Sequence, residues 1–257
     1  MLVVNADDFG FTRGVNRGIV HAHEHGILSA TTLMANGDAF EDAVRLARAT
    51  PSLDVGCHLV LIQGHSLLSG RDLPRTWIEC VRALLTRQLD VYGELRAQVQ
   101  RIVDAGLRPS HFDTHKHTHV LPNVLQAVIR LARDFSVPYI RLPFDAGWRL
   151  VRPLDAWHRS RLKNAHLQTT DHFLGFRLTD SLTEQSLSAA LSELPEGSTE
   201  FMCHPGYLGE DLRHAATRLK ETRERELAAL TSNRVKDVIA SRGIVVTNFR
   251  ELSSERR

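Results

Sequence analysis

The sequence predicts an α/β fold: a (β/α) barrel, TIM-like and irregular, with about seven parallel strands. Two observations predict it. Short apolar runs alternate with longer helical periods along 257 residues without a linker, low-complexity tract or internal repeat, so residues 1–257 are expected to form a single domain. Polar and ionisable residues also recur where the predicted strands end, which is where the active sites of such barrels gather. An open doubly wound sheet is the alternative.

Strands and helices alternate regularly in the first half of the chain. Short apolar runs predict strands at residues 2–6, 28–34 and 54–61. Helices are expected at residues 15–25, 39–49, 77–88 and 91–105. The first of these helices ends at Gly26, a favoured C-cap, and the second stops before Pro51.

The second half of the chain continues the alternation less regularly. Strands are expected at residues 110–113, 138–143, 166–175, 199–206 and 243–249. Helices are expected from Pro122 onward, at residues 148–163 and at residues 222–241. Pro122 suits the first position of a helix, whereas Pro153 is expected to interrupt the helix that contains it.

The composition excludes several classes of protein. The 32 Lys and Arg residues nearly balance the 30 Asp and Glu residues, so no nucleic-acid partner is expected. No apolar run approaches the roughly 18 residues that span a bilayer, and the first residues do not resemble a signal peptide, so a cytoplasmic protein without a membrane span is expected. The three cysteines are expected to be buried free thiols. The sequence also lacks phosphate-binding glycine loops and a Gly-x-Ser-x-Gly elbow, which removes nucleotide, flavin and serine-hydrolase functions.

Ionisable residues gather at the predicted strands and their ends. Because the carboxyl ends of parallel strands meet at one edge of the sheet, residues far apart in sequence are expected to share one pocket. These residues are Asp7, Asp8, His58, Asp113, His115, Arg141, Asp171, His172 and His204.

The segment "HFDTHKHTH", residues 111–119, is the densest cluster of metal-ligand types in the chain. In an extended segment, His115, His117 and His119 would share one face. One or two of them are expected to bind a metal ion, and the others to orient ligands or contact substrate. Asp113 would accept the second ring N–H of a ligand histidine. The alternative is a solvated polar loop.

The motif "NADDFG" places two carboxylates, Asp7 and Asp8, at the end of the first strand. Two ionised carboxylates in one dry pocket repel each other unless a cation or a shared proton lies between them. Both can face one pocket only where the strand breaks, and Gly10 offers that break. One acid is expected to bind metal while its neighbour acts as a base; an Asp turn after a strand is the alternative.

Two further histidines and one arginine complete the expected site. His58 would form a two-histidine, one-carboxylate set with Asp8 and His115, a pattern that leaves room for water and substrate; otherwise it is a satisfied core histidine. His204 precedes a Pro-Gly turn and suits an acid or base, or is simply a turn histidine. Arg141 either lines the pocket or forms an ion pair with a neighbour. The histidines expected on a solvated surface are His21, His23, His25, His158 and His214.

With these residues, the sequence resembles the YdjC-like carbohydrate deacetylase family, whose best-known members remove an acetyl group from chitooligosaccharides. The resemblance rests on the motifs "NADDFG", "GILSATTLMANG", "VGCHLVL", "HFDTHKHTHVLP" and "MCHPG", which occur in the expected order from residue 5 to beyond residue 206. It implies a (β/α) barrel-like fold and a divalent cation, usually magnesium with zinc as the alternative, held by Asp8, His58 and His115. It also implies that Asp7 is the base. Residues 62–110 and 144–175 have no clear counterpart in the chitooligosaccharide branch, so the substrate stays open.

The expected reaction is hydrolysis of the acetyl group of an N-acetylated sugar, either chitooligosaccharide-like or a related amino-sugar conjugate. The metal ion would polarise the amide carbonyl and activate water, Asp7 would remove the water proton, and His204 would protonate the leaving amine. His117, His119 and Arg141 are expected to contact the substrate. A homodimer is left open.

Three other functions compete with this one. A metal-dependent hydrolase of a phosphoester or of a non-sugar amide would use the same ligands. A two-carboxylate glycosidase is less favoured, because Asp7 and Asp8 are neighbours, whereas such enzymes place their carboxyl groups about 5–9.5 Å apart around the bond. A non-catalytic sugar- or metal-binding protein would need neither a base nor an acid.

Overall fold

The fold is seen in a computed structural model, which describes residues 1–144 and 152–255. The start of the helix expected at residues 148–163 lies outside the described residues. Its described part is α6 (Arg152–Asn164), which runs on without a break because Pro153 lies in its first turn, where a missing N–H breaks no helical hydrogen bond.

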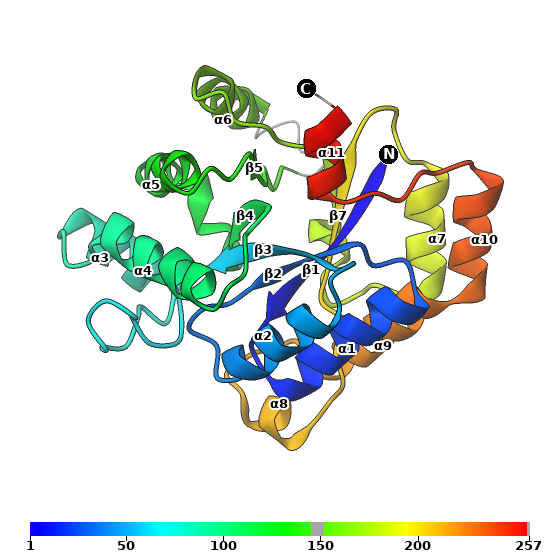
Figure 1. Ribbon diagram of the computed structural model, residues 1–257, viewed down its shortest axis with the longest axis horizontal. Coiled ribbons are helices and arrows are strands. Elements are labelled where there is room, and N and C mark those ends of the chain that lie inside the picture. The colour runs from blue at the N-terminus through cyan, green and yellow to red at the C-terminus, as the bar shows by residue number, and fades with distance from the viewer. Residues whose placement is uncertain (145–151, 256–257) are drawn as a thin grey trace.

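Seven parallel strands form one curled sheet, with helices outside it (Figure 1). The strands lie in the order β5-β4-β3-β2-β1-β7-β6, which is the circular order of a barrel opened between β5 and β6. The strands are β1 (Leu2–Phe9), β2 (Ala30–Leu33), β3 (Asp54–Leu59), β4 (His111–Thr114), β5 (Tyr139–Ile140), β6 (His172–Leu174) and β7 (Thr199–Cys203). The predicted fold class, an irregular (β/α) barrel with about seven parallel strands, is confirmed.

The irregularity lies between β5 and β6, where a single strand was expected at residues 166–175. Its first part follows β5, since Gln168 donates its N–H to Pro138 O (2.8 Å) and accepts from the Ile140 N–H (3.0 Å). Its last part, β6, pairs with β7 instead. The first part of the segment therefore bonds to the β5 edge of the sheet and the last part to β7, and no continuous strand joins the two parts.

The helices cover the outer face of the sheet (Figure 1). They are α1 (Arg13–His25), α2 (Phe40–Ala49), α3 (Trp77–Leu85), α4 (Val91–Asp104), α5 (Pro122–Asp134), α7 (Glu184–Ser192), α8 (Glu210–His214), α9 (Glu221–Thr231) and α10 (Asn233–Ser241). A further helix, α11 (Phe249–Glu255), packs on the inner side of the sheet instead. Val4, Ala6, Leu33 and Phe201 are among the strand residues whose side chains enter the core under these helices. None of the helices in the described part of the chain combines the length and the apolar character that crossing a bilayer requires.

Two expected elements differ in the structure. The helix expected at residues 222–241 is two helices, α9 and α10, because Ser232 ends the first and its side chain accepts the Arg234 N–H as the N-cap of the second. The strand expected at residues 243–249 is a single bridge between Val246 and Leu2, after which α11 begins. A helix not predicted, α7, carries a capping box between Thr183 and Ser186 as its sequence signal.

Helix α11 packs against the amino-terminal part of the barrel interior. Its Phe249 and Leu252 pack with Val3 of β1, Ala30 of β2 and Tyr139 of β5. The residue after Phe249, Arg250, donates to Asp54 Oδ1 (2.8 Å) and to Leu53 O (2.7 Å), which fixes the helix to the start of β3. An apolar floor therefore closes this end, and the polar interior lies toward the carboxyl ends of the strands, where barrel active sites are built.

Candidate metal and catalytic site

The backbone at the end of β1 is strained in a way that brings both acids inside. Asp8 has φ 69°, in the left-handed region, and the pairing register with β2 shifts between Ala6 and Phe9. This conformation costs about 1–3 kcal/mol for a non-glycine residue. It also breaks the alternation of side chains, so Asp7 and Asp8 are both buried, at 3% and 4% exposed. The break lies at Asp8 itself and not only at Gly10.

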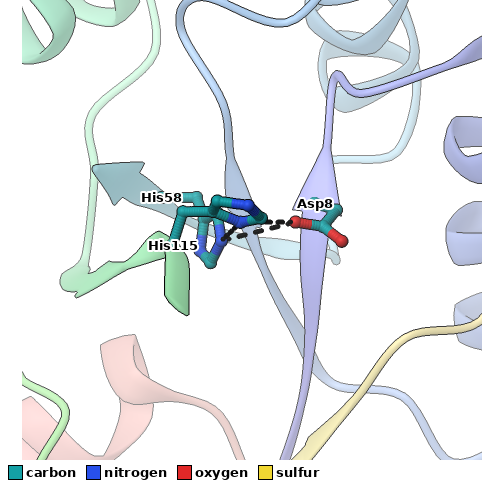
Figure 2. Close-up of side chains that lie close together, drawn as sticks. All are labelled: Asp8, His58 and His115. Atoms are coloured by element: carbon teal, nitrogen blue, oxygen red, sulfur yellow. Dashed lines mark hydrogen bonds and ion pairs between the residues drawn. The ribbon is translucent and has the colours of Figure 1, made fainter. Parts of the chain in front are cut away.

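Asp8, His58 and His115 converge on one point (Figure 2). Asp8 Oδ1 lies 3.4 Å from His58 Nε2 and 3.3 Å from His115 Nδ1, and the two ring nitrogens are 3.2 Å apart. His58 comes from β3, and His115 begins the 3₁₀ segment η1 (His115–Val120) directly after β4. Three atoms that carry lone pairs approach this closely only around a shared proton or a cation.

Asp113 sets which nitrogen of His58 faces this point. The Asp113 Oδ1 accepts from His58 Nδ1 at 2.7 Å, which leaves the Nε2 lone pair directed at Asp8 and His115. Burial acts to lower the pKa of His58, but Asp113, together with Asp8 and Asp7, raises it to about 10. The surroundings therefore stabilise a positive charge here. A divalent cation would supply such a charge, and one carboxylate with two imidazoles is a ligand set that such ions accept.

Beneath the cluster, Arg141 joins three buried carboxylates. It binds both oxygens of Asp7 (2.7 and 2.8 Å), Asp113 Oδ2 (2.8 Å) and Glu200 Oε1 (2.7 Å). Burial acts to raise the pKa of Asp7, but the Arg141 guanidinium outweighs it and holds this pKa well below its usual range. For Glu200, burial prevails over Arg141 and raises the pKa to about 7. Arg141 is 1% exposed and is linked to His58 of the candidate metal site through Asp113, which contacts both.

Glu200 was missed in the sequence. It lies on β7 ("TEFMC") between Thr199 and Phe201, and its signal is a lone charge inside a buried strand, the same signal that singled out Arg141. A charge at such a position requires a partner of opposite charge in the fold.

His204 follows β7 and is 8% exposed. Burial lowers its pKa to about 4, against the nearby carboxylates of Asp7 and Asp8, which act to raise it. Its backbone N–H donates to Glu226 Oε2 at 2.5 Å. His204 therefore lies near the acid pair and is neutral at neutral pH.

The histidines of residues 115–119 do not share one face. Lys116 and His117 both have φ 54°, so the segment winds into η1 and is not extended as expected. His119 is buried, with Nδ1 2.6 Å from Thr114 Oγ1 and Nε2 donating to Arg141 O at 2.8 Å. The His117 ring packs against Phe173 and Phe176, and its Nδ1 is buried without a hydrogen-bond partner.

Two expected neighbours stay away from the site. Asp171 and His172 lie at the start of β6, where Asp171 Oδ2 accepts from the backbone N–H and the hydroxyl of Ser198 at the amino end of the sheet. They were placed wrongly because the strand begins at His172 and not at residue 166.

His158 was expected on the surface but is buried, with Nδ1 donating to Leu154 O and its ring against Phe144. All three cysteines are buried and free, as predicted.

Known proteins resemble this chain over its whole length. A carbohydrate deacetylase from Brevibacillus brevis is 36% identical over 98% of this chain and 99% of its own, and a chitooligosaccharide deacetylase from Enterobacter sp. (strain 638) is 35% identical over 98% and 99%. A crystal structure from Enterococcus faecalis V583, described as a candidate cellobiose-phosphate cleavage protein, is 26% identical with a TM-score of 0.81 over 98% of both chains.

The fold is also shared more widely. A lactam utilization protein from Thermus thermophilus is 18% identical, with a TM-score of 0.55 over 96% of this chain and 99% of its own. The family model for YdjC-like proteins matches residues 1–241. The resemblance drawn from the sequence motifs is thereby confirmed, and the chain belongs to the YdjC-like protein family.

Proposed function

We propose that this protein is a metal-dependent hydrolase that removes the acetyl group of an N-acetylated sugar. The observation that carries the proposal is the meeting of Asp8, His58 and His115 beside a second, ionised carboxylate, Asp7. The deacetylase names of the relatives at 35–36% identity support the choice of substrate class.

In this proposal Asp8, His58 and His115 hold a divalent cation, with Mg²⁺ expected first and Zn²⁺ as the alternative. When bound, such an ion polarises the amide carbonyl and lowers the pKa of water. Asp113 accepts from the Nδ1 of His58 and so directs its Nε2 toward the metal position, where a bound ion would take the place of the Nε2 proton.

The protein's own groups then move the protons. Asp7 accepts the proton of the attacking water, and Arg141 holds both of its oxygens in place through two hydrogen bonds. His204 gives a proton to the leaving amine. Since its pKa is about 4, His204 is neutral before the reaction at neutral pH, so the proton that it gives to the amine is the one that Asp7 has taken from water and passed on to His204.

The residues proposed to contact substrate divide into two groups. His117 has a buried ring nitrogen without a partner and two aromatic neighbours, which fits a contact to a sugar. His119 and Arg141 have their polar atoms bound to the protein, so we assign them to supporting the site from below.

A phosphoester hydrolase is the second candidate, because the Enterococcus faecalis structure is described as acting on a sugar phosphate. An assay over N-acetylated sugars and sugar phosphates, with acetate and phosphate measured in parallel, separates the two. Acetate release that stops with chelator and returns with Mg²⁺ or Zn²⁺ is the expected result. Phosphate release alone, or acetate release that chelator does not change, would contradict the proposal. Tight sugar binding without either product would indicate a binding protein.

A further inference from the structure

Two buried charges of helix α9 reach the candidate site from outside the barrel. Arg223 and Glu226 lie one turn apart on α9, and each is 1% exposed. Neither belongs to the sequence motifs that suggested the family. Buried charges of this kind are costly unless they are paired, so their partners indicate what they do.

Arg223 holds one oxygen of Asp8. Its Nη2 donates to Asp8 Oδ2 at 2.5 Å, and its Nε donates to Leu219 O at 3.2 Å, which fixes the guanidinium. The other oxygen, Oδ1, faces His58 and His115, while Oδ2 points away from both rings (Figure 2). The carboxylate is thus divided, with one oxygen for the arginine and one for the candidate metal position.

Glu226 holds the turn that carries His204. Its Oε2 accepts the His204 N–H at 2.5 Å, and one turn earlier on α9 the Arg223 carbonyl accepts the Gly206 N–H at 3.2 Å. On its other side this turn packs against α1, where a Cβ on Gly18 would lie 2.4 Å from the Gly206 Cα. The turn is therefore fixed between α1 and α9, which lie side by side in Figure 1.

We propose that α9 positions both halves of the site: Arg223 limits Asp8 to one metal-facing oxygen, and Glu226 fixes the backbone of His204. Carboxylates bind divalent cations through one or both oxygens. With Oδ2 held by Arg223, a coordination position that a chelating Asp8 would fill stays open for water or substrate. The part that concerns turnover rests on the proposed hydrolase function, whereas the part that concerns Asp8 can be tested by metal binding alone.

The test of Arg223 uses Co²⁺ as the probe, because its visible absorption reports coordination. We compare the wild type, Arg223→Met, Arg223→Lys, and Arg225→Met as the control on the exposed side of the same helix. Arg223→Met is expected to keep Co²⁺ binding by calorimetry, to change the Co²⁺ spectrum and to lower kcat about 10–100-fold, as loss of a group that orients a metal ligand does. Arg223→Lys, which keeps the charge, is expected to lie between Arg223→Met and the wild type.

An unchanged spectrum in Arg223→Met, or loss of Co²⁺ binding in a folded Arg223→Met protein, overturns the role of Arg223. If Arg223→Met does not fold, the spectrum of Arg223→Lys decides in the same way. A wild type that binds Co²⁺ but releases no acetate leaves this part standing while the proposed function fails. A wild type that binds no Co²⁺ contradicts both the role of Arg223 and the proposed function.

The test of Glu226 compares a variant that keeps the hydrogen-bond acceptor with one that lacks it. Glu226→Gln retains an oxygen for the His204 N–H and is expected to keep kcat within about threefold. Glu226→Leu removes the acceptor and is expected to lower kcat up to about 100-fold through misplacement of His204, with Co²⁺ affinity and KM unchanged. Equal kcat in the two variants, or a parallel loss of Co²⁺ affinity, overturns the role of Glu226.

Discussion

At the scale of single residues, two buried arginines pair with four buried carboxylates around the site. Arg141 forms ion pairs with Asp7, Asp113 and Glu200, and Arg223 forms one with Asp8. The lowered pKa of Asp7 keeps it ionised at neutral pH, and its two hydrogen bonds to Arg141 leave it little freedom to rotate. Asp7 is thus a fixed, charged carboxylate and not a carboxyl that shares a proton with its neighbour, as its proposed role as base requires.

Replacing Asp7 with Asn tests that role. The amide keeps the size of the side chain but cannot accept the water proton, so turnover is expected to fall by about 10²–10⁴ in an acetate-release assay. Binding of Co²⁺ by calorimetry is expected to stay, because Asp8, His58 and His115 are unchanged. The exposed Asp38→Asn is the control. Turnover close to that of the wild type would exclude Asp7 as the base.

The acidity of Glu226 predicts a pH dependence of stability. Burial raises its pKa from 4.5 to about 7, so the folded protein binds this proton more tightly than the unfolded chain does. The resulting stabilisation is complete below about pH 4.5 and is lost as pH rises through 7, which corresponds to about 3 kcal/mol.

Denaturant unfolding of the metal-free protein at pH 5 and pH 8 measures this effect. The wild type is expected to lose more unfolding free energy between these pH values than Glu226→Gln, which cannot ionise. The exposed Glu224→Gln should behave as the wild type. Equal losses in wild type and Glu226→Gln would mean that Glu226 is ionised throughout.

At the scale of elements, the sequence predicts those that have a strong apolar pattern. Strands β1, β2, β3 and β7 and helices α1 and α2 match apolar runs or helical periods closely. The segment after β4 could not be predicted, because "HKHTHV" has almost no apolar residues and its form depends on left-handed Lys116 and His117. The start of β6 was also missed. The residues around Gln168 bond to β5, and only the pairing of His172–Leu174 with β7 marks where β6 begins.

The position of helix α11, at the amino end of the barrel, leads us to expect that it stabilises the fold without affecting metal binding. Phe249 is 1% exposed at the amino end of the barrel, so Phe249→Ala should lower the unfolding free energy by about 3–5 kcal/mol. The exposed Val245→Ala is expected to change it little. Denaturant unfolding measures both variants, and Co²⁺ calorimetry of folded Phe249→Ala should match the wild type. A loss of Co²⁺ affinity would show that the floor also shapes the metal position.

At the scale of the whole molecule, the convergence of remote residues could be predicted, but their pairing could not. Parallel strand topology alone places Asp8, His58 and His115 at one end of a sheet. It does not reveal that Arg141 joins three carboxylates or that Arg223, far along the chain, holds Asp8. Such pairs depend on distances across the interior, which no local pattern encodes.

A bound cation should therefore stabilise the whole fold. At a concentration 100 times its Kd, a ligand that binds only the native state adds about 2.7 kcal/mol. Calorimetric scans with and without Co²⁺ are expected to show this as a higher Tm in the wild type and no shift in His115→Ala. The surface variant His214→Ala should keep the shift. A shift that survives in His115→Ala would place the cation elsewhere.

The apolar floor of the barrel has a consequence for synthesis on the ribosome. Val3 and Ala30 are made early and Tyr139 past the middle of the chain, but Phe249 and Leu252, which cover them, are made near residue 250. At about 5–20 residues per second, this leaves the floor uncovered for on the order of 10–50 s after β1 has been translated. The apolar side chains of β1 and β2 that form the floor thus stay uncovered for most of translation. A chaperone that shields apolar segments can bind them during this interval.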